Sequence, residues 1–148
     1  MKQTNQPRTP HQPHLVLATL ALCAFAATSS LATDRTWTGG AAPDGNWQSA
    51  ANWGGTAPAT RDALFFDGST QLATTNDFST GTIFGGLTFN GGAGAFTLAG
   101  NGLVLTNAAQ DLSSSALSGG GISTSSASDQ TNNGALTLSA GNHAIATG

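Results

Sequence analysis

Four short segments of the chain each place two large apolar side chains two residues apart. They are Leu87-Thr88-Phe89, Phe96-Thr97-Leu98, Leu103-Val104-Leu105 and Leu136-Thr137-Leu138. A spacing of two puts both apolar side chains on one face of an extended strand, and the β-branched residue between them suits the opposite, solvent-facing side. No apolar stripe with the period of a helix occurs after residue 33. The pattern therefore predicts an all-β fold of short strands.

Connectors rich in glycine and asparagine separate these segments and suit turns with positive φ. The first three segments begin at residues 87, 96 and 103, too close together for helices to intervene. Two architectures fit this spacing: a short β-solenoid resembling a parallel β-helix, with roughly 20 to 25 residues per coil, and a small antiparallel β-sandwich. We favour the solenoid, because runs of very small residues allow successive coils to stack closely.

Residues 1–32 have the pattern of a signal peptide. Lys2 and Arg8 supply a positive start, and residues 15–27 form an apolar run that is too short to span a bilayer. Ser30-Leu31-Ala32 places small residues at the two positions that a signal peptidase reads, so we expect cleavage after Ala32. A buried N-terminal helix is the alternative, but the polar flanks offer it neither a cap nor an amphipathic partner. The sequence thus predicts a secreted or cell-surface protein with no membrane span after cleavage.

The cysteine content fits export without a disulfide framework. Cys23, the one cysteine, lies in the apolar run, and the residue before it, Leu22, is too large for a lipoprotein signal. Residues 33–148 contain no cysteine and cannot form a disulfide. Gly, Thr, Ser and Asn make up half of them. Stability is therefore expected to come from backbone pairing and a modest core.

Residues 33–148 divide into two parts of different composition. Residues 33–68 hold Trp37, Trp47 and Trp53, and we interpret them as a Trp-rich N-terminal capping module. Residues 69–148 contain no Pro, Trp, Lys or Arg, and we interpret them as a β-strand repeat region, expected to be truncated. The tryptophans have two interpretations. They either form a hydrophobic plug over the first coil, which we favour, or offer stacking platforms for a neutral glycan.

These residues resemble a known family. The blocks that carry the resemblance are Thr36-Trp37-Thr38-Gly39-Gly40, Asn46-Trp47-Gln48-Ser49-Ala50-Ala51-Asn52-Trp53, Arg61-Asp62-Ala63-Leu64-Phe65-Phe66-Asp67-Gly68, Gly86-Leu87-Thr88-Phe89 and Gly134-Ala135-Leu136-Thr137-Leu138. Together they look like secreted bacterial proteins with the autotransporter-associated β-strand repeat, over about residues 36 to 140. The resemblance implies an exported β-helical segment of the passenger type. No membrane barrel or sorting tail follows the repeats in this sequence, so the mode of surface attachment stays open.

The charged residues argue against several function classes. Four Lys and Arg against seven Asp, with no Glu, give a net charge of −3 and no basic stripe for nucleic acid. Asp62 and Asp67 are candidates for a glycosidase pair, but turn and capping roles are the simpler interpretation. His143, the one histidine after the leader, has no acidic neighbour in sequence and is expected to be an exposed strand residue. We therefore expect no enzyme and no catalytic residue.

One segment approaches a metal-binding motif without completing it. Residues 91–99 follow the calcium-binding nonapeptide pattern, except that Phe96 stands where the motif has its ligating aspartate. A phenyl ring offers no oxygen ligand, so the sequence predicts a solenoid turn without an ion. No metal site and no cofactor are expected.

These observations lead to one functional expectation with an alternative. We expect a non-catalytic, exported β-solenoid segment with a structural or adhesive role at the cell surface. Polysaccharides or other cell-surface components are its candidate partners, and an open C-terminal strand edge is a candidate site of self-association. The alternative is a carbohydrate-binding module that uses Trp37, Trp47 and Trp53.

Overall fold

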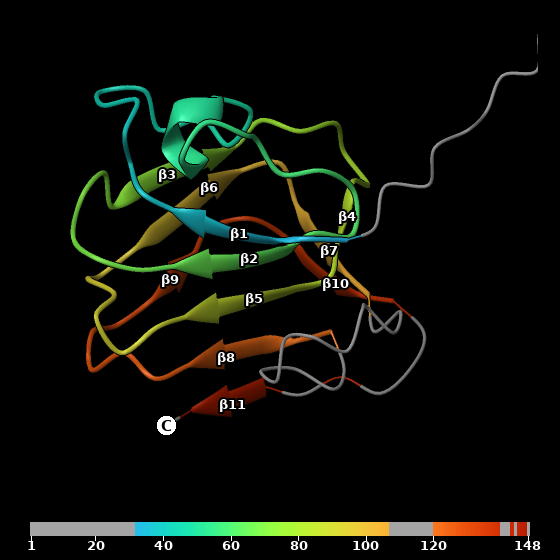
Figure 1. Cartoon of the computed structure of the whole chain (residues 1–148). Helices are drawn as coiled ribbons and strands as arrows, with labels where there is room; N and C mark the ends of the chain where they lie inside the picture. The colour runs from blue at the N-terminus through green and yellow to red at the C-terminus, as the bar shows by residue number, and fades with distance from the viewer. Residues whose placement is uncertain (1–31, 107–119, 140–142, 144, 148) are drawn as a thin grey trace, which may run out of the picture.

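The structure is a computed structural model that describes residues 32–106, 120–139, 143 and 145–147 (Figure 1). The predicted signal peptide, apart from Ala32, lies outside these residues. The described part contains eleven strands and one short 3-10 helix. They are β1 (Asp34–Trp37), η1 (Ala50–Trp53), β2 (Ala63–Phe66), β3 (Ala73–Asn76), β4 (Ile83–Phe84), β5 (Gly86–Phe89), β6 (Thr97–Gly100), β7 (Leu103–Leu105), β8 (Ile122–Thr124), β9 (Thr131–Asn132), β10 (Leu136–Leu138) and β11 (Ile145–Thr147).

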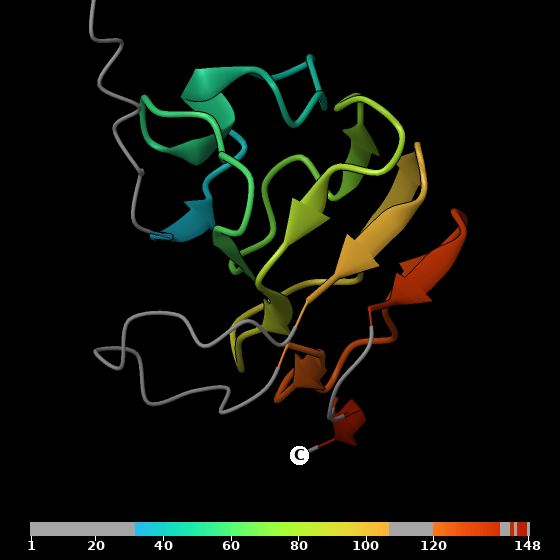
Figure 2. The ribbon, with the colours of Figure 1, turned by 90° about the vertical axis from the view of Figure 1, so that its right-hand side faces the viewer.

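The strands form three sheets, each of which collects every third strand of the chain from β2 onward. The orders are β1-β2-β5-β8-β11, β3-β6-β9 and β4-β7-β10. All strand pairs in the described residues are parallel. The predicted all-β class is therefore confirmed, and the antiparallel sandwich is wrong. In Figure 1 the five-stranded sheet runs from β1 above to β11 below, and Figure 2 shows the same sheet from its side.

The register stacks like residues on one another. In the five-stranded sheet Leu64 pairs with Leu87, Leu87 with Ile122, and Ile122 with Ile145. Two residues further along the strands, Phe66 pairs with both Trp37 and Phe89. Because successive side chains on a strand point to opposite faces, each such row lies on one face of the sheet. In β2 the face that carries Leu64 and Phe66 is the inner one, because these two residues are buried whereas Ala63 and Phe65, which alternate with them, are half-buried.

A single core lies among the three sheets. Its buried side chains come from all of them, for example Phe66 from β2, Leu98 from β6 and Leu105 from β7. Both apolar residues of three predicted segments are buried, namely those of residues 87–89, 96–98 and 103–105. The prediction that these pairs face inward is therefore confirmed.

The fourth predicted segment differs from the other three. Leu136 and Leu138 in β10 align with Leu103 and Leu105 in β7, but each remains 38% exposed. The reason is position, since β10 is the last strand of its sheet and no described strand covers it. The middle residues also vary: Thr137 is exposed as expected, whereas Thr88 is buried at 8% exposure.

Candidate functional site

The Trp-rich module, residues 33–68, is organised around a buried asparagine. Asn52 in η1 is fully buried, and its side-chain oxygen accepts a hydrogen bond from the amide of Ala41 at 2.9 Å. Its side-chain nitrogen donates to the carbonyl oxygens of Asp44 at 2.8 Å and Asn46 at 3.0 Å. The helix then stops at Gly54, whose φ of 69° lies in the left-handed region that favours glycine. One side chain thus holds three backbone groups of a loop that has little regular structure.

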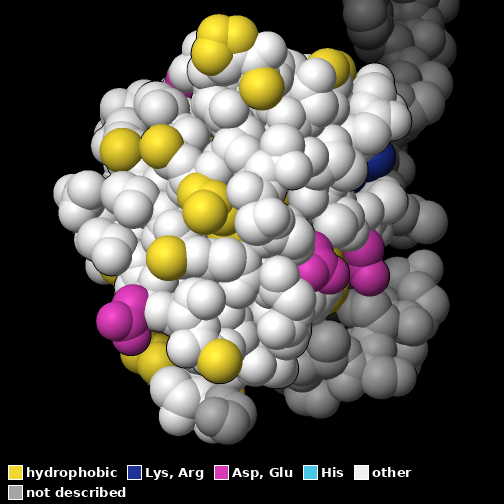
Figure 3. Space-filling model, turned by 90° about the vertical axis from the view of Figure 1, so that its left-hand side faces the viewer, with side chains coloured by type: hydrophobic (Ala, Val, Ile, Leu, Met, Phe, Trp, Pro, Cys, Tyr) yellow, Lys and Arg dark blue, Asp and Glu magenta, His cyan; other side chains and the backbone are white. Residues whose placement is uncertain are grey.

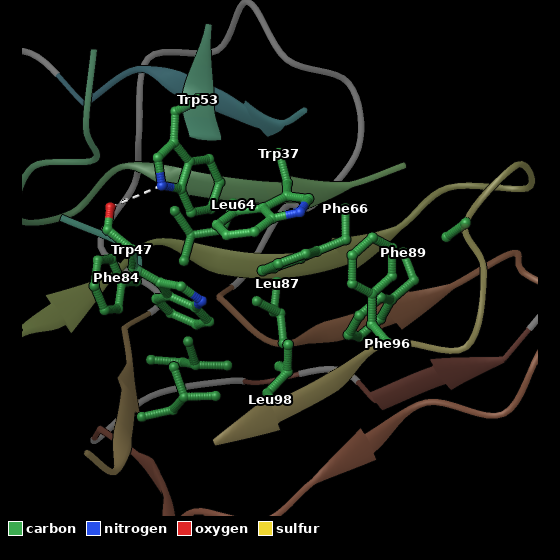
Figure 4. Packing of buried hydrophobic residues seen from close by; sticks show 13 residues of the cluster. Trp37, Trp47, Trp53, Leu64, Phe66, Phe84, Leu87, Phe89, Phe96 and Leu98 are labelled. Atoms are coloured by element: carbon green, nitrogen blue, oxygen red, sulfur yellow. Dashed lines mark hydrogen bonds between the residues drawn. The ribbon is translucent and has the colours of Figure 1, made fainter. Parts of the chain in front are cut away.

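The three tryptophans converge on the inner face of β2 (Figure 4). Trp37 and Trp47 each meet Trp53 edge to face, with ring centroids 5.1 and 6.1 Å apart. Phe66 contacts all three rings at centroid distances of 5.9, 5.7 and 5.7 Å. The rings therefore pack against one another and against a strand of the core.

Each indole nitrogen also has a hydrogen-bond acceptor within the protein. Trp37 donates to the carbonyl oxygen of Thr70 at 3.3 Å, and Trp53 to that of Trp47 at 2.8 Å. Trp47 donates to the hydroxyl of Thr74 at 3.0 Å. The polar ends of the rings are thereby satisfied inside the protein, as buried indoles require.

The burial of the tryptophans bears on their two interpretations. Trp37, Trp47 and Trp53 are 1%, 0% and 5% exposed. A sugar stacks on an open ring face, and these three rings have none in this structure. The geometry therefore argues against the glycan platform and favours the hydrophobic plug.

Asp62 is a buried carboxylate with a structural set of partners. It is 1% exposed and accepts hydrogen bonds from the amides of Thr33 at 2.8 Å and Ala59 at 2.9 Å. The guanidinium of Arg35 donates to the same carboxylate at 3.0 Å. These donors tie the turn before β2 to the start of β1. The sequence suggested a turn role for this aspartate, but nothing in it indicated the pairing with Arg35.

Asp67 does not join Asp62 in a catalytic pair. The two residues flank β2 at opposite ends, so the four residues of that strand, rising roughly 3.3 Å each, separate them. Asp67 is half-buried, and its carboxylate accepts from the amide of Gly68 at 2.7 Å and the side chain of Asn90 at 3.1 Å. A pair of facing carboxylates, as glycosidases use, is therefore not formed by these two residues.

His143 occupies a different environment from the expected one. It is half-buried and lies before β11, so the prediction of an exposed strand residue is wrong. One ring nitrogen contacts the carbonyl oxygen of Gly120, and Nε2 lies 2.6 Å from the carbonyl oxygen of Ser139. Both of these partners are backbone oxygens, and neither is a carboxylate that could orient the ring for catalysis. The ring instead links the segment at Gly120 to the segment at Ser139.

An exposed aspartate stabilises the loop of the Trp-rich module. The carboxylate of Asp44 accepts a hydrogen bond from the hydroxyl of Ser49 and another from the amide of Asn46 at 3.0 Å. The hydrogen bond from the Ser49 hydroxyl, and to a smaller extent the one from the Asn46 amide, lowers the pKa of Asp44 below its ordinary value of 3.8. The carboxylate is thus held in its charged form by the turn that it closes.

The metal-like segment contains a core residue where a calcium ligand would stand. Phe96 is fully buried and packs on Phe66, with ring centroids 5.2 Å apart. Across residues 32–106, 120–139, 143 and 145–147, no group of three His, Cys, Asp or Glu side chains could hold a metal ion. The aromatic ring therefore fills the turn from inside.

Apolar exposure is concentrated at one end of the described fold. Leu136 and Leu138 of β10 are joined there by Ile145 of β11, which is 70% exposed. We call the strands β9, β10 and β11, each the last of its sheet, the C-terminal edge. Of these strands, β11 lies at the bottom of Figure 1.

Comparison of the chain with protein-family models, with curated proteins and with solved structures found no match. Within the described residues no helix is long and apolar enough to cross a membrane. The function of the chain is therefore inferred from its own residues. The two features available are the tryptophan plug at one end and the C-terminal edge at the other.

Proposed function

We propose that this chain is an exported, non-catalytic β-solenoid segment with a structural or adhesive role at the cell surface. The observation that supports it best is the repeat in strand pairing. Ala63 in β2 pairs with Gly86 in β5, and Ala73 in β3 pairs with Thr97 in β6. These two sequence intervals are nearly equal, and both lie within the range of roughly 20 to 50 residues that is usual for one unit of a repeat protein. Three successive strands, one in each sheet, then make one coil.

The next coil is longer but keeps the same register. Leu103 in β7 pairs with Leu136 in β10, and the interval between them contains residues 107–119. Repeat proteins can keep their stacked strands aligned although the intervals between them differ in length. The register that β7 and β10 share across this longer interval therefore supports a coiled repeat.

The Trp-rich module fits the role of a cap on the first coil. Residues 45–47 run along β3, where the amide of Trp47 donates to the carbonyl oxygen of Thr75 at 3.0 Å and the amide of Thr75 donates to that of Gly45 at 2.8 Å. The amide of Arg61 donates to the carbonyl oxygen of Ile83 in β4 at 2.7 Å. Terminal units of repeat proteins need such covers because their inner faces have no neighbour on one side.

The outer surface is suited to neutral contacts. Figure 3 shows one face made largely of polar side-chain and backbone atoms, with scattered hydrophobic side chains and a few charged side chains, among them acidic ones that lie together at the right of the view. Such a surface offers many hydroxyl and amide groups and little net charge. It supports contacts with neutral polysaccharides or other cell-surface components over contacts with strongly charged partners.

The proposed family is that of secreted bacterial proteins with the autotransporter-associated β-strand repeat. Several of the residues that carry the resemblance belong to the plug and the strands beside it. Trp37 lies in β1, Trp53 in η1 and Phe66 in β2. Their shared packing gives a physical reason for these residue types to occur together.

Export is tested by following processing of the full chain with a C-terminal epitope in a bacterial host. We expect cleavage after Ala32 and recovery outside the cytoplasm, measured by N-terminal sequencing and cell fractionation. Leu20→Arg, which places a charge in the apolar run, should block both, whereas Leu20→Ile should not. An unprocessed wild-type chain that stays in the cytoplasm would contradict the proposal.

Adhesion is tested with the exported protein on beads presented to bacterial cells and to a panel of neutral and acidic polysaccharides. Retention of the beads by cells or neutral glycans supports an adhesive role. A lack of retention on every surface would argue against the adhesive role, and the proposed function would then be the structural role alone. Phe65→Ala tests whether the outer face of β2 takes part in retention, because Phe65 lies on the opposite face of β2 from the buried Phe66.

A further inference from the structure

One row of side chains on the outer face of the five-stranded sheet combines hydroxyl groups with an aromatic ring. Thr36, Phe65, Thr88 and Ser123 align through the parallel register of β1, β2, β5 and β8, which lie side by side in Figure 1. Neighbouring strands of a sheet lie roughly 4.7 to 4.9 Å apart. The row therefore presents one side chain at each of these short and regular steps. We call these four residues the outer row.

The polar and aromatic groups of the outer row are not used within the described fold. The hydroxyls of Thr36, Thr88 and Ser123 have no hydrogen-bond partner among the described residues, in contrast to that of Thr74. Thr36 is exposed, Phe65 and Ser123 are half-buried, and Thr88 is 8% exposed. Phe65 lies outside the core cluster, and its ring contacts no other aromatic ring in the described part of the chain. These groups are therefore available to a ligand.

We propose that the outer row binds a neutral, extended polysaccharide, an inference that rests on the proposed function, in which the surface contacts neutral glycans. A sugar ring has a face of C–H groups that stacks on an aromatic side chain and a rim of hydroxyls that donate and accept hydrogen bonds. An extended polysaccharide repeats both at every sugar, a step similar in size to the separation of strands. The polysaccharide lies across the strands, with one sugar on Phe65 and its neighbours beside Thr36 and Ser123.

The charges around the outer row select against an anionic ligand. The row itself carries no charge, and Asp34 lies two residues before it in β1 while Asp67 lies two residues after it, just beyond β2. Arg35 is on the inner face of β1 and is paired with Asp62. Carboxylates beside a binding surface repel uronic acids and phosphates. A neutral polysaccharide is therefore the expected ligand rather than an acidic one.

The same face is poorly suited to a protein partner. The strands β2 and β5 are paired on both sides, so they offer no free edge to which another strand could be added. A standard protein interface uses roughly 20 to 30 residues per partner around buried apolar anchors. The outer row offers Phe65 as its one large apolar side chain. Recognition through single hydroxyls and one ring fits a glycan better.

Binding is tested by depletion of the full chain from solution by insoluble cellulose and, separately, by insoluble chitin. Phe65→Ala removes the stacking ring and should raise the dissociation constant about fivefold or more. Thr36→Val removes one hydroxyl but keeps the shape of the side chain, and should raise it about twofold or more. Thr97→Val in β6 and Val104→Ala in β7 alter half-buried residues on the other two sheets and should leave binding unchanged.

Unchanged tryptophan fluorescence shows that each variant is folded, since the plug lies on the inner face. If Phe65→Ala does not fold, Phe65→Leu keeps apolar volume without a flat ring and should weaken binding in the same direction. Equal binding by wild type and by the Phe65 and Thr36 variants would overturn this site, whereas adhesion through another surface would stand. Absence of binding to both cellulose and chitin, or tighter binding to anionic polygalacturonate, would also overturn it. Retention of the protein by bacterial cells in that case would still support the proposed function.

Discussion

Phe66 contacts five other aromatic rings of the core, and its removal gives the sharpest stability prediction. It is fully buried and contacts Trp37, Trp47 and Trp53 at 5.7 to 5.9 Å between ring centroids. It also stacks on Phe89 at 5.4 Å. Phe66→Ala leaves a cavity among rings that are held by backbone pairing and cannot collapse fully. Such substitutions cost about 3 to 5 kcal/mol, and we expect the upper half of that range.

The neighbouring phenylalanine provides the control. Phe65 has the same side chain on the same strand but is only half-buried and faces the other way. Phe65→Ala should therefore cost about 1 kcal/mol, since less apolar surface returns to water. The difference between the two variants measures the alternation of β2 directly.

Urea unfolding of the full chain, followed by tryptophan fluorescence, measures both effects. If Phe66→Ala leaves no folded baseline, Phe66→Leu keeps much of the side-chain volume and should show a smaller loss in the same direction. Equal losses for the alanine variants of Phe65 and Phe66, or a larger loss at Phe65, would refute the assigned inner face of β2.

Three further predictions concern polar groups and the last residue of β6. Asp62→Ala leaves buried donors without their acceptor and should lower the free energy of unfolding by about 3 kcal/mol, measured by urea unfolding. Arg35→Ala should lower it by less, because the Arg35 side chain is partly exposed and the backbone amides still donate to the Asp62 carboxylate. Ser49→Ala should raise the pKa of Asp44 toward 3.8, measured by NMR titration. Because the folded-state pKa of Asp44 is lowered, its stabilising effect is present above pH 3.8 and is lost as the pH falls through the folded-state value. The variant should show a weaker dependence, since the amide of Asn46 still donates to the carboxylate. Gly100→Ala should cost about 2 kcal/mol in urea unfolding, because φ is 90° and a Cβ there would clash with the carbonyl oxygen of Asn76.

The apolar spacing predicted β5 and β7 well, because their inward residues are large and two apart. Leu87 with Phe89 and Leu103 with Leu105 are buried as this spacing requires. The tryptophans could be predicted to form a plug because so few other large apolar residues are available. In these places local pattern and tertiary packing agree.

The strand β3 could not be predicted from apolar spacing, because its inward residues are polar. Thr74 and Asn76 are 1% and 2% exposed. The hydroxyl of Thr74 accepts from Trp47, and the side-chain amide of Asn76 donates to the carbonyl oxygen of Asn101 at 2.9 Å. Buried polar residues are tolerated when hydrogen-bonded, but the partners that satisfy these two lie far away in sequence.

The candidate site shows the same limit. The pairing of Asp62 with Arg35 and the two carbonyl contacts of His143 join separate segments, so no local motif announces them. Residue type alone allowed a sugar platform at Trp37, Trp47 and Trp53. Their burial became evident only once Phe66 and the loop held by Asn52 were placed beside them.

The most direct test of the stacked parallel register is an NMR measurement of short backbone distances between strands. The register predicts parallel-strand contacts of Thr88 in β5 with both Phe65 in β2 and Ser123 in β8. Antiparallel contacts between residues 87–89 and 96–98, the pattern of a hairpin between neighbouring segments, would contradict the account.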